Sequence, residues 1–114
     1  FSVKVYIVNT GWVGESAQSG AKRFSLPKTR KILNSILNDS IEKFDFGMDM
    51  YLGFEIPKKL DSLDPKTLNP LHAWKDLDKY HSSAIMLVNK FQDNYQLYDL
   101  GDKNILNAGP QIPK

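Results

Sequence analysis

Cysteine is absent from the 114 residues of the chain, which excludes disulfides, thiolate metal sites and thiol nucleophiles. A strong charge of one sign is also absent. The sequence has 15 Lys and Arg against 13 Asp and Glu, so its formal net charge is only +2. Because nucleic acids and anionic membranes select strongly basic surfaces, we expect neither as a partner.

Long apolar runs are missing as well. No stretch approaches the ~20 apolar residues that a membrane-spanning helix requires, and no secretory leader is visible. The lack of cysteine is compatible with a cytoplasmic location, although secreted proteins without cysteine exist. The chain begins with Phe1 rather than Met and enters a strand pattern almost at once. We therefore expect a trimmed or excised segment, or a start that lies further upstream.

The apolar pattern predicts a single α/β domain. Residues 3–8 are apolar on both faces, as in an inner strand, although the chain offers few partner strands. Residues 44–56 repeat with a period of two, which indicates a strand or a bent hairpin. We expect residues 57–70 to form an ordered loop. The residues expected to share one face of 44–56 are Met48, Met50, Leu52, Phe54 and Ile56, and the expected loop anchors are Leu60, Leu63 and Leu68.

Helical spacing of apolar residues occurs twice. The first predicted helix covers residues 27–38, and Pro27 suits its first turn because a proline there loses no intrahelical hydrogen bond. The second covers residues 77–97, with Asp76 as its N-cap. One stripe of this second helix should face the core. Its members are Tyr80, Ala84, Leu87, Phe91 and Tyr95.

The loop between the first strand and the first helix is the best candidate for a binding site. It carries glycines and ends in Lys22-Arg23, and glycines, cations and a helix N-terminus together suit an anionic ligand. The loop is not a P-loop, because Gly14 and Gly20 are one residue too far apart and Arg23 replaces the required hydroxyl. The dinucleotide motif G-x-G-x-x-G is also absent. Cations before a helix interact unfavourably with its dipole. Their presence here therefore indicates a role for these residues, such as holding an anion or stacking on a ring.

Other polar and aromatic residues have simpler interpretations. Trp12, directly after the first strand, is expected to plug an edge of the core rather than to stack on a base. The Thr29 hydroxyl either bonds to its own backbone, which the pattern favours, or donates to a ligand. His72 and His81 lack partners at metal-ligand spacing, so a zinc site is not expected. Four carboxylates that form no defensible catalytic pair are assigned to turns and the surface: Asp45, Asp49, Asp61 and Asp64.

A series of short motifs resembles ATP-dependent phosphoenolpyruvate carboxykinase. The most specific part is the pair of segments 6–12 (YIVNTGW) and 20–30 (GAKRFSLPKTR). Further matching segments follow in the same order, namely 54–57 (FEIP), 68–70 (LNP) with Trp74, 91–95 (FQDNY) and 108–110 (AGP). Their common order over nearly the whole chain argues against coincidence.

The resemblance implies that residues 1–114 are one C-terminal segment of a larger nucleotide-binding catalytic domain, with a mixed sheet and about two main helices. The parent would be a cytoplasmic, gluconeogenic lyase that converts oxaloacetate and ATP to phosphoenolpyruvate, CO2 and ADP, using Mg²⁺ and Mn²⁺. Its P-loop and metal ligands would lie upstream. By the same resemblance, Arg23 and Phe24 would contact the adenosine part of ATP, and Thr29 would line that pocket.

Two expectations follow for the isolated segment. It should lack catalytic activity and tightly bound cofactors, since the remainder of the parent chain would supply the phosphate cradle and the metals. It should also expose apolar surface and self-associate, either through the strand at residues 3–8 or through the face of residues 44–56. Two alternatives remain open at this stage: a stand-alone, non-catalytic module that binds a nucleotide or a protein, and a structural fragment that binds nothing.

Overall fold

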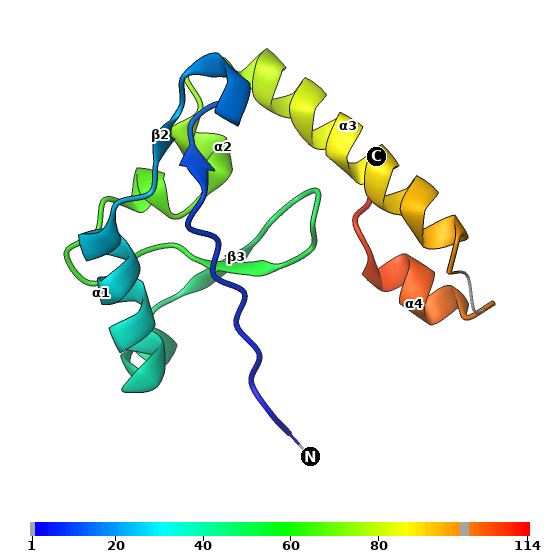
Figure 1. The fold of residues 1–114 in the computed structure, drawn as a ribbon. Coiled ribbons are helices and arrows are strands. Elements are labelled where there is room, and N and C mark those ends of the chain that lie inside the picture. Colours follow the sequence, from blue (N-terminus) through cyan, green and yellow to red (C-terminus); the bar gives the residue numbers. More distant parts are fainter. Residues whose placement is uncertain (1, 99–100) are drawn as a thin grey trace.

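The architecture is known from a computed structural model that describes residues 2–98 and 101–114 (Figure 1). It is a small α/β arrangement with two separate sheets, each of two antiparallel strands. In chain order the elements are β1 (Trp12–Val13), η1 (Ala17–Ser19), β2 (Lys22–Arg23), α1 (Leu26–Leu37), η2 (Ser40–Lys43), β3 (Phe46–Met48), β4 (Glu55–Pro57), η3 (Pro65–Thr67), α2 (Pro70–Ala73), α3 (Leu77–Gln96) and α4 (Lys103–Ala108).

The expected mixed sheet is wrong for the described residues, since both sheets are short antiparallel hairpins. The expected strand at residues 3–8 is also wrong. This segment extends alone from the rest of the molecule (Figure 1), and Val3, Val5 and Ile7 are 72–81% exposed. A strand exists only where its backbone groups are paired, and no described segment pairs with this one. Its one described tether is an ion pair between Lys4 and Glu42.

The two main helices confirm the prediction. Helix α1 begins at Leu26, with Pro27 in its first turn, and ends at Leu37. Helix α3 begins at Leu77, and the Asp76 carboxylate caps it by accepting a hydrogen bond from the Lys79 N–H at 3.1 Å. Apolar spacing locates both helices, and the Asp76 cap also marks the start of α3, which explains why the sequence alone locates them. Neither α3 nor any other helix in the described ranges is long and apolar enough to cross a bilayer.

The hydrophobic core consists of two clusters. In the first, Ile41, Leu60 and Leu63 are buried, and half-buried Leu68 packs against them. The predicted loop anchors are therefore confirmed. The other partly buried members are Ile32 and Ile36 from α1, with Phe44 and Phe46. This cluster attaches α1 to the loop that follows β4.

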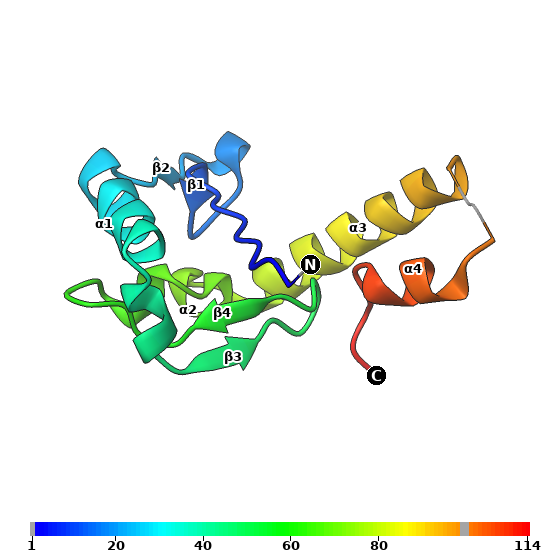
Figure 2. The same ribbon diagram turned by 90° about the horizontal axis from the view of Figure 1, so that it is seen from below.

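The second cluster joins Tyr51, Tyr80 and the fully buried Val88. The predicted stripe on α3 is only partly right, because Leu87 and Phe91 are 43% and 50% exposed. The first half of α3 packs against Tyr51 and the α2 region, whereas its second half extends outward beside α4 (Figures 1 and 2). Which face of a helix is buried depends on where its neighbours stop, and the sequence does not contain that information.

The expected bent hairpin over residues 44–56 is confirmed, as β3 and β4 pair antiparallel with Gly47 opposite Ile56. The apolar residues that were expected to share one face are not the buried residues of this hairpin. Met48 and Phe54 are 66% and 51% exposed, whereas Asp49 and Tyr51 are buried. The Asp49 carboxylate accepts hydrogen bonds from the N–H groups of Tyr51 and Leu52, at 3.1 and 2.5 Å. This turn interrupts the alternation and rotates Tyr51 into the core.

Candidate functional site

The candidate site is the short β1–β2 hairpin and the start of α1. The prediction of a plain loop between the first strand and the first helix was too simple, because this region contains β1 and the turn η1. Trp12 lies opposite Arg23 in the hairpin register, and the Phe24 N–H donates a 2.8 Å hydrogen bond to the Gly11 carbonyl. Two residues per strand suffice for pairing here, because β1 and β2 are close in sequence and the loop-closure cost is small.

Gly14 attaches the hairpin to helix α2. Its φ of +85° lies in the left-handed region, and a Cβ built on it would approach the Ala73 carbonyl oxygen to 2.9 Å. Both the conformation and the space therefore require glycine. The close approach fixes the hairpin against α2, and Figure 2 shows the two lying near one another.

Trp12 does not plug the core, contrary to the prediction. Its side chain is 52% exposed, and it belongs to neither core cluster. Instead the Arg23 guanidinium carbon lies over the indole, 5.6 Å from the ring centroid. This distance is within the range of a cation–π interaction. Sequence reasoning missed this pair because it depends on strand register.

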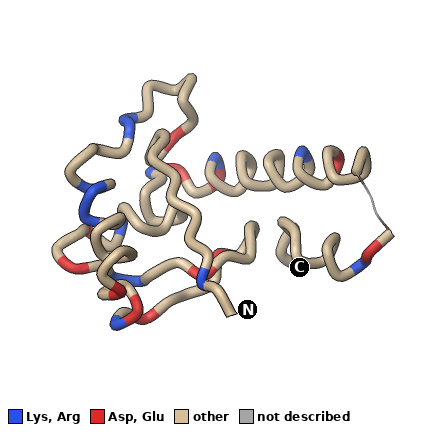
Figure 3. The backbone as a smooth tube through the Cα atoms, turned by 60° about the horizontal axis from the view of Figure 1, so that its bottom comes forward, with Lys and Arg blue, Asp and Glu red and all other residues tan. Residues whose placement is uncertain are grey.

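The segment that runs from the turn after β1 through α1 is basic. Residues 16–38 contain no Asp or Glu and carry five cations, namely Lys22, Arg23, Lys28, Arg30 and Lys31. Figure 3 shows basic positions following the chain from the hairpin into α1. Within residues 2–98 and 101–114, Arg23 forms no ion pair; the pairs present there are Lys4–Glu42 and Lys79–Asp76. The positive charge of Arg23 is therefore available to a ligand.

The start of α1 adds to this positive potential. Ser25 occupies the N-cap position, but its side chain caps no N–H group, and the first turn contains no acidic residue. The free N–H groups of a helix N-terminus favour negative or electron-rich partners. The N-terminus of α1 and the hairpin thus both present positive potential.

Of the predicted contact residues, Arg23 is exposed while Phe24 and Thr29 are half-buried. The Thr29 hydroxyl donates to the Ser25 carbonyl at 3.1 Å, as the simpler interpretation expected. Its oxygen keeps lone pairs that can accept a hydrogen bond. The structure brings all three residues to the junction of β2 and α1. Their contact with a nucleotide stays a prediction.

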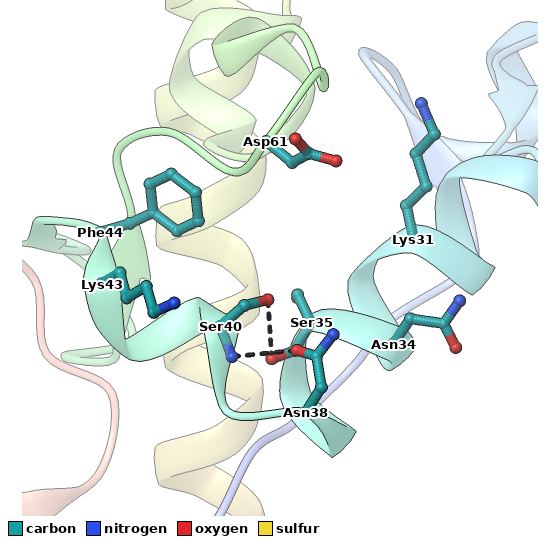
Figure 4. A pocket seen from close by; sticks show the side chains of 8 residues that line it. All are labelled: Lys31, Asn34, Ser35, Asn38, Ser40, Lys43, Phe44 and Asp61. Atoms are coloured by element: carbon teal, nitrogen blue, oxygen red, sulfur yellow. Dashed lines mark hydrogen bonds between the residues drawn. The ribbon is translucent and has the colours of Figure 1, made fainter.

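Most residues at this junction are exposed, and a separate pocket lies further along α1. That pocket, of about 250 Å³, lies between α1, η2 and the segment containing Asp61 (Figure 4). Its lining residues are Lys31, Asn34, Ser35, Asn38, Ser40, Lys43, Phe44 and Asp61. None of the predicted contact residues lines it.

The two histidines lie in different surroundings. His81 Nδ1 lies 2.6 Å from the Tyr51 hydroxyl, inside an aromatic group with Tyr80. Burial raises the pKa of Tyr80 to about 12, and the charge of Asp49 adds to this shift. His72 is exposed in the last turn of α2. In the part of the chain that the structure describes, no three His, Asp or Glu side chains lie together as metal ligands do.

Fold and site thus define an α/β chain with a cationic hairpin ahead of a helix. The family model described as phosphoenolpyruvate carboxykinase matches residues 1–66. Curated relatives named "Phosphoenolpyruvate carboxykinase (ATP)" match along almost the whole chain. The Novosphingobium aromaticivorans protein is 41% identical over 95% of the chain, that of Thermus thermophilus 38% over 95%, and that of Sulfurimonas denitrificans 36% over 96%.

The chain belongs to the phosphoenolpyruvate carboxykinase family, as its motifs indicated. It spans about a fifth of the length of these relatives, 20–21% in each case.

Proposed function

We propose that this chain is the C-terminal segment of an ATP-dependent phosphoenolpyruvate carboxykinase, and that its β1–β2 hairpin lines the adenine and ribose side of the ATP site. The complete enzyme would convert oxaloacetate and ATP to phosphoenolpyruvate, CO2 and ADP in cytoplasmic gluconeogenesis. The observation that supports the site is the exposed Arg23 guanidinium, which forms no ion pair within the described residues and lies in a segment without carboxylates.

Each of the three residues suits a purine nucleoside. An arginine guanidinium stacks on the face of a base. The lone pairs of the Thr29 oxygen can accept from an exocyclic amino group, because the hydroxyl proton is already donated to Ser25. The Phe24 N–H is used within the hairpin, so we assign its contact to the remaining backbone carbonyl or to the ring.

The metals do not fit this part of the protein. No suitable cluster of carboxylates and imidazoles occurs in the described residues, so Mg²⁺ and Mn²⁺ would be held by the rest of the enzyme. When bound there, they would neutralise phosphate and carboxylate charge. The residues described here only bind and orient the nucleoside, away from the reacting phosphate.

Turnover measurements test the proposed activity. We expect the full-length enzyme to form phosphoenolpyruvate and CO2 from oxaloacetate and ATP when both metals are present, and the isolated chain to form neither. The assay follows CO2 release and ADP together. Turnover by the isolated chain, or none by the full-length protein, would contradict the proposal.

We also expect the isolated chain to self-associate through residues 3–8, which expose valine and isoleucine side chains and unpaired strand-like backbone. Val5→Lys should shift the average mass towards the 13.0 kDa monomer, as measured by light scattering over a concentration series. Ser2→Lys is the matched control, because it adds the same charge without removing an apolar side chain. A monomer at every concentration would refute this expectation.

A further inference from the structure

We infer that Trp12 is the positioning residue for Arg23: its indole face holds the guanidinium where the base of the nucleotide binds. This inference rests on the proposed function and goes beyond it, since it concerns how the chain keeps the Arg23 guanidinium oriented for stacking on the base.

The exposure of Trp12 calls for an explanation other than core packing. Its side chain is 52% exposed and it lies outside both core clusters. The other tryptophan, Trp74, is half-buried and packs edge-on against Tyr80, with 5.8 Å between ring centroids. The described contact of the Trp12 ring is the one with Arg23, at 5.6 Å. Its surroundings therefore assign it a partner rather than a place in the core.

Arg23 needs such a partner. An arginine side chain has many rotamers, and ordering it at the moment of binding reduces affinity. Arg23 forms no ion pair with the other described residues, so no carboxylate orders it. A planar guanidinium has two faces. One can rest on Trp12 while the other is left for a purine, which gives a stack of indole, guanidinium and base.

The platform under Arg23 is itself held in place. The register sets Trp12 directly opposite Arg23, and the hydrogen bond from the Phe24 N–H to the Gly11 carbonyl closes the hairpin beside them at 2.8 Å. On the other side, Gly14 lies tightly against the Ala73 carbonyl. The indole is thus anchored to helix α2 through the backbone, and it can orient Arg23 relative to the rest of the fold.

Two other roles for Trp12 make different predictions. If Trp12 contacted the base directly, its loss would weaken ATP binding even without Arg23. If it only stabilised the fold, its loss would lower the unfolding temperature and affect both substrates. Positioning predicts an effect on ATP alone that disappears when Arg23 is removed.

A double-mutant cycle in the full-length enzyme separates these roles. Trp12→Leu should raise the KM for ATP about two- to fivefold, as expected for loss of an exposed cation–π contact, with little change in the KM for oxaloacetate. Trp12→Phe, which keeps an aromatic face, should recover most of this loss. In an Arg23→Ala background, Trp12→Leu should have no further effect. Trp74→Leu is the control. It should lower thermal stability without a specific effect on the KM for ATP.

The outcomes are distinguishable. The positioning role would be overturned if Trp12→Leu raised the KM for ATP equally with and without Arg23. It would also be overturned if Trp12→Leu raised the KM for both substrates in parallel with a fall in melting temperature. If Trp12→Leu fails to fold, the same comparison with Trp12→Phe and Trp12→Tyr decides. If Arg23→Ala changes the KM for ATP but no Trp12 variant does, the positioning inference alone fails. If Arg23→Ala leaves that KM unchanged, the proposed role of the hairpin fails with it.

Discussion

Replacing Arg23 by alanine is expected to raise the KM for ATP of the full-length enzyme roughly ten- to a hundredfold, the range of a lost base-stacking contact. The KM for oxaloacetate should stay essentially unchanged, because the proposed contact of Arg23 is with the adenine of ATP and not with oxaloacetate. The KM for ATP of Arg23→Lys should lie between those of the unchanged enzyme and Arg23→Ala, since lysine keeps the charge but loses the planar face. Steady-state kinetics, with each substrate varied in turn, measures the KM for ATP and the KM for oxaloacetate of both variants.

Arg30→Ala is the matched control for this prediction. It removes the same charge from an exposed position of α1, so it reports any general electrostatic attraction of the basic segment for ATP. We expect a small effect that disappears at high salt. If Arg30→Ala and Arg23→Ala raised the KM for ATP equally, the specific stacking role of Arg23 would be wrong.

Leu60→Ala should destabilise the isolated chain by about 2–5 kcal/mol, the cost of a large-to-small change in a packed core. Leu60 is 1% exposed and holds the loop after β4 against α1 and η2. Such a loss is a large fraction of the stability of a small domain. Urea unfolding followed by circular dichroism measures it.

The same substitution at Leu37 provides the comparison. Leu37 ends α1 and is 82% exposed, so Leu37→Ala should change the free energy of unfolding of the isolated chain by only a few tenths of a kcal/mol. Similar losses for the two variants would show that the first core cluster does not form as described.

The family was predictable from the sequence, whereas the candidate site stays a prediction. The motif order identified the family, and the glycines and cations before α1 marked the hairpin region. The Thr29 hydrogen bond to Ser25 was also the favoured interpretation, because it involves residues within one helical turn. The pairing of Trp12 with Arg23 was not predictable, because it depends on which residues of two short strands lie opposite each other.

Helices α1 and α3 and the β3–β4 hairpin were determined by the sequence itself, since caps, helical spacing and short-range pairing act between residues close along the chain. The tertiary structure alone decided which surfaces are buried. It turned Asp49 and Tyr51 inward, left Leu87 and Phe91 half-exposed, and left residues 3–8 without a partner strand among the described residues. A strand needs a second strand and a buried face needs a neighbour, and both depend on contacts between residues far apart in the chain.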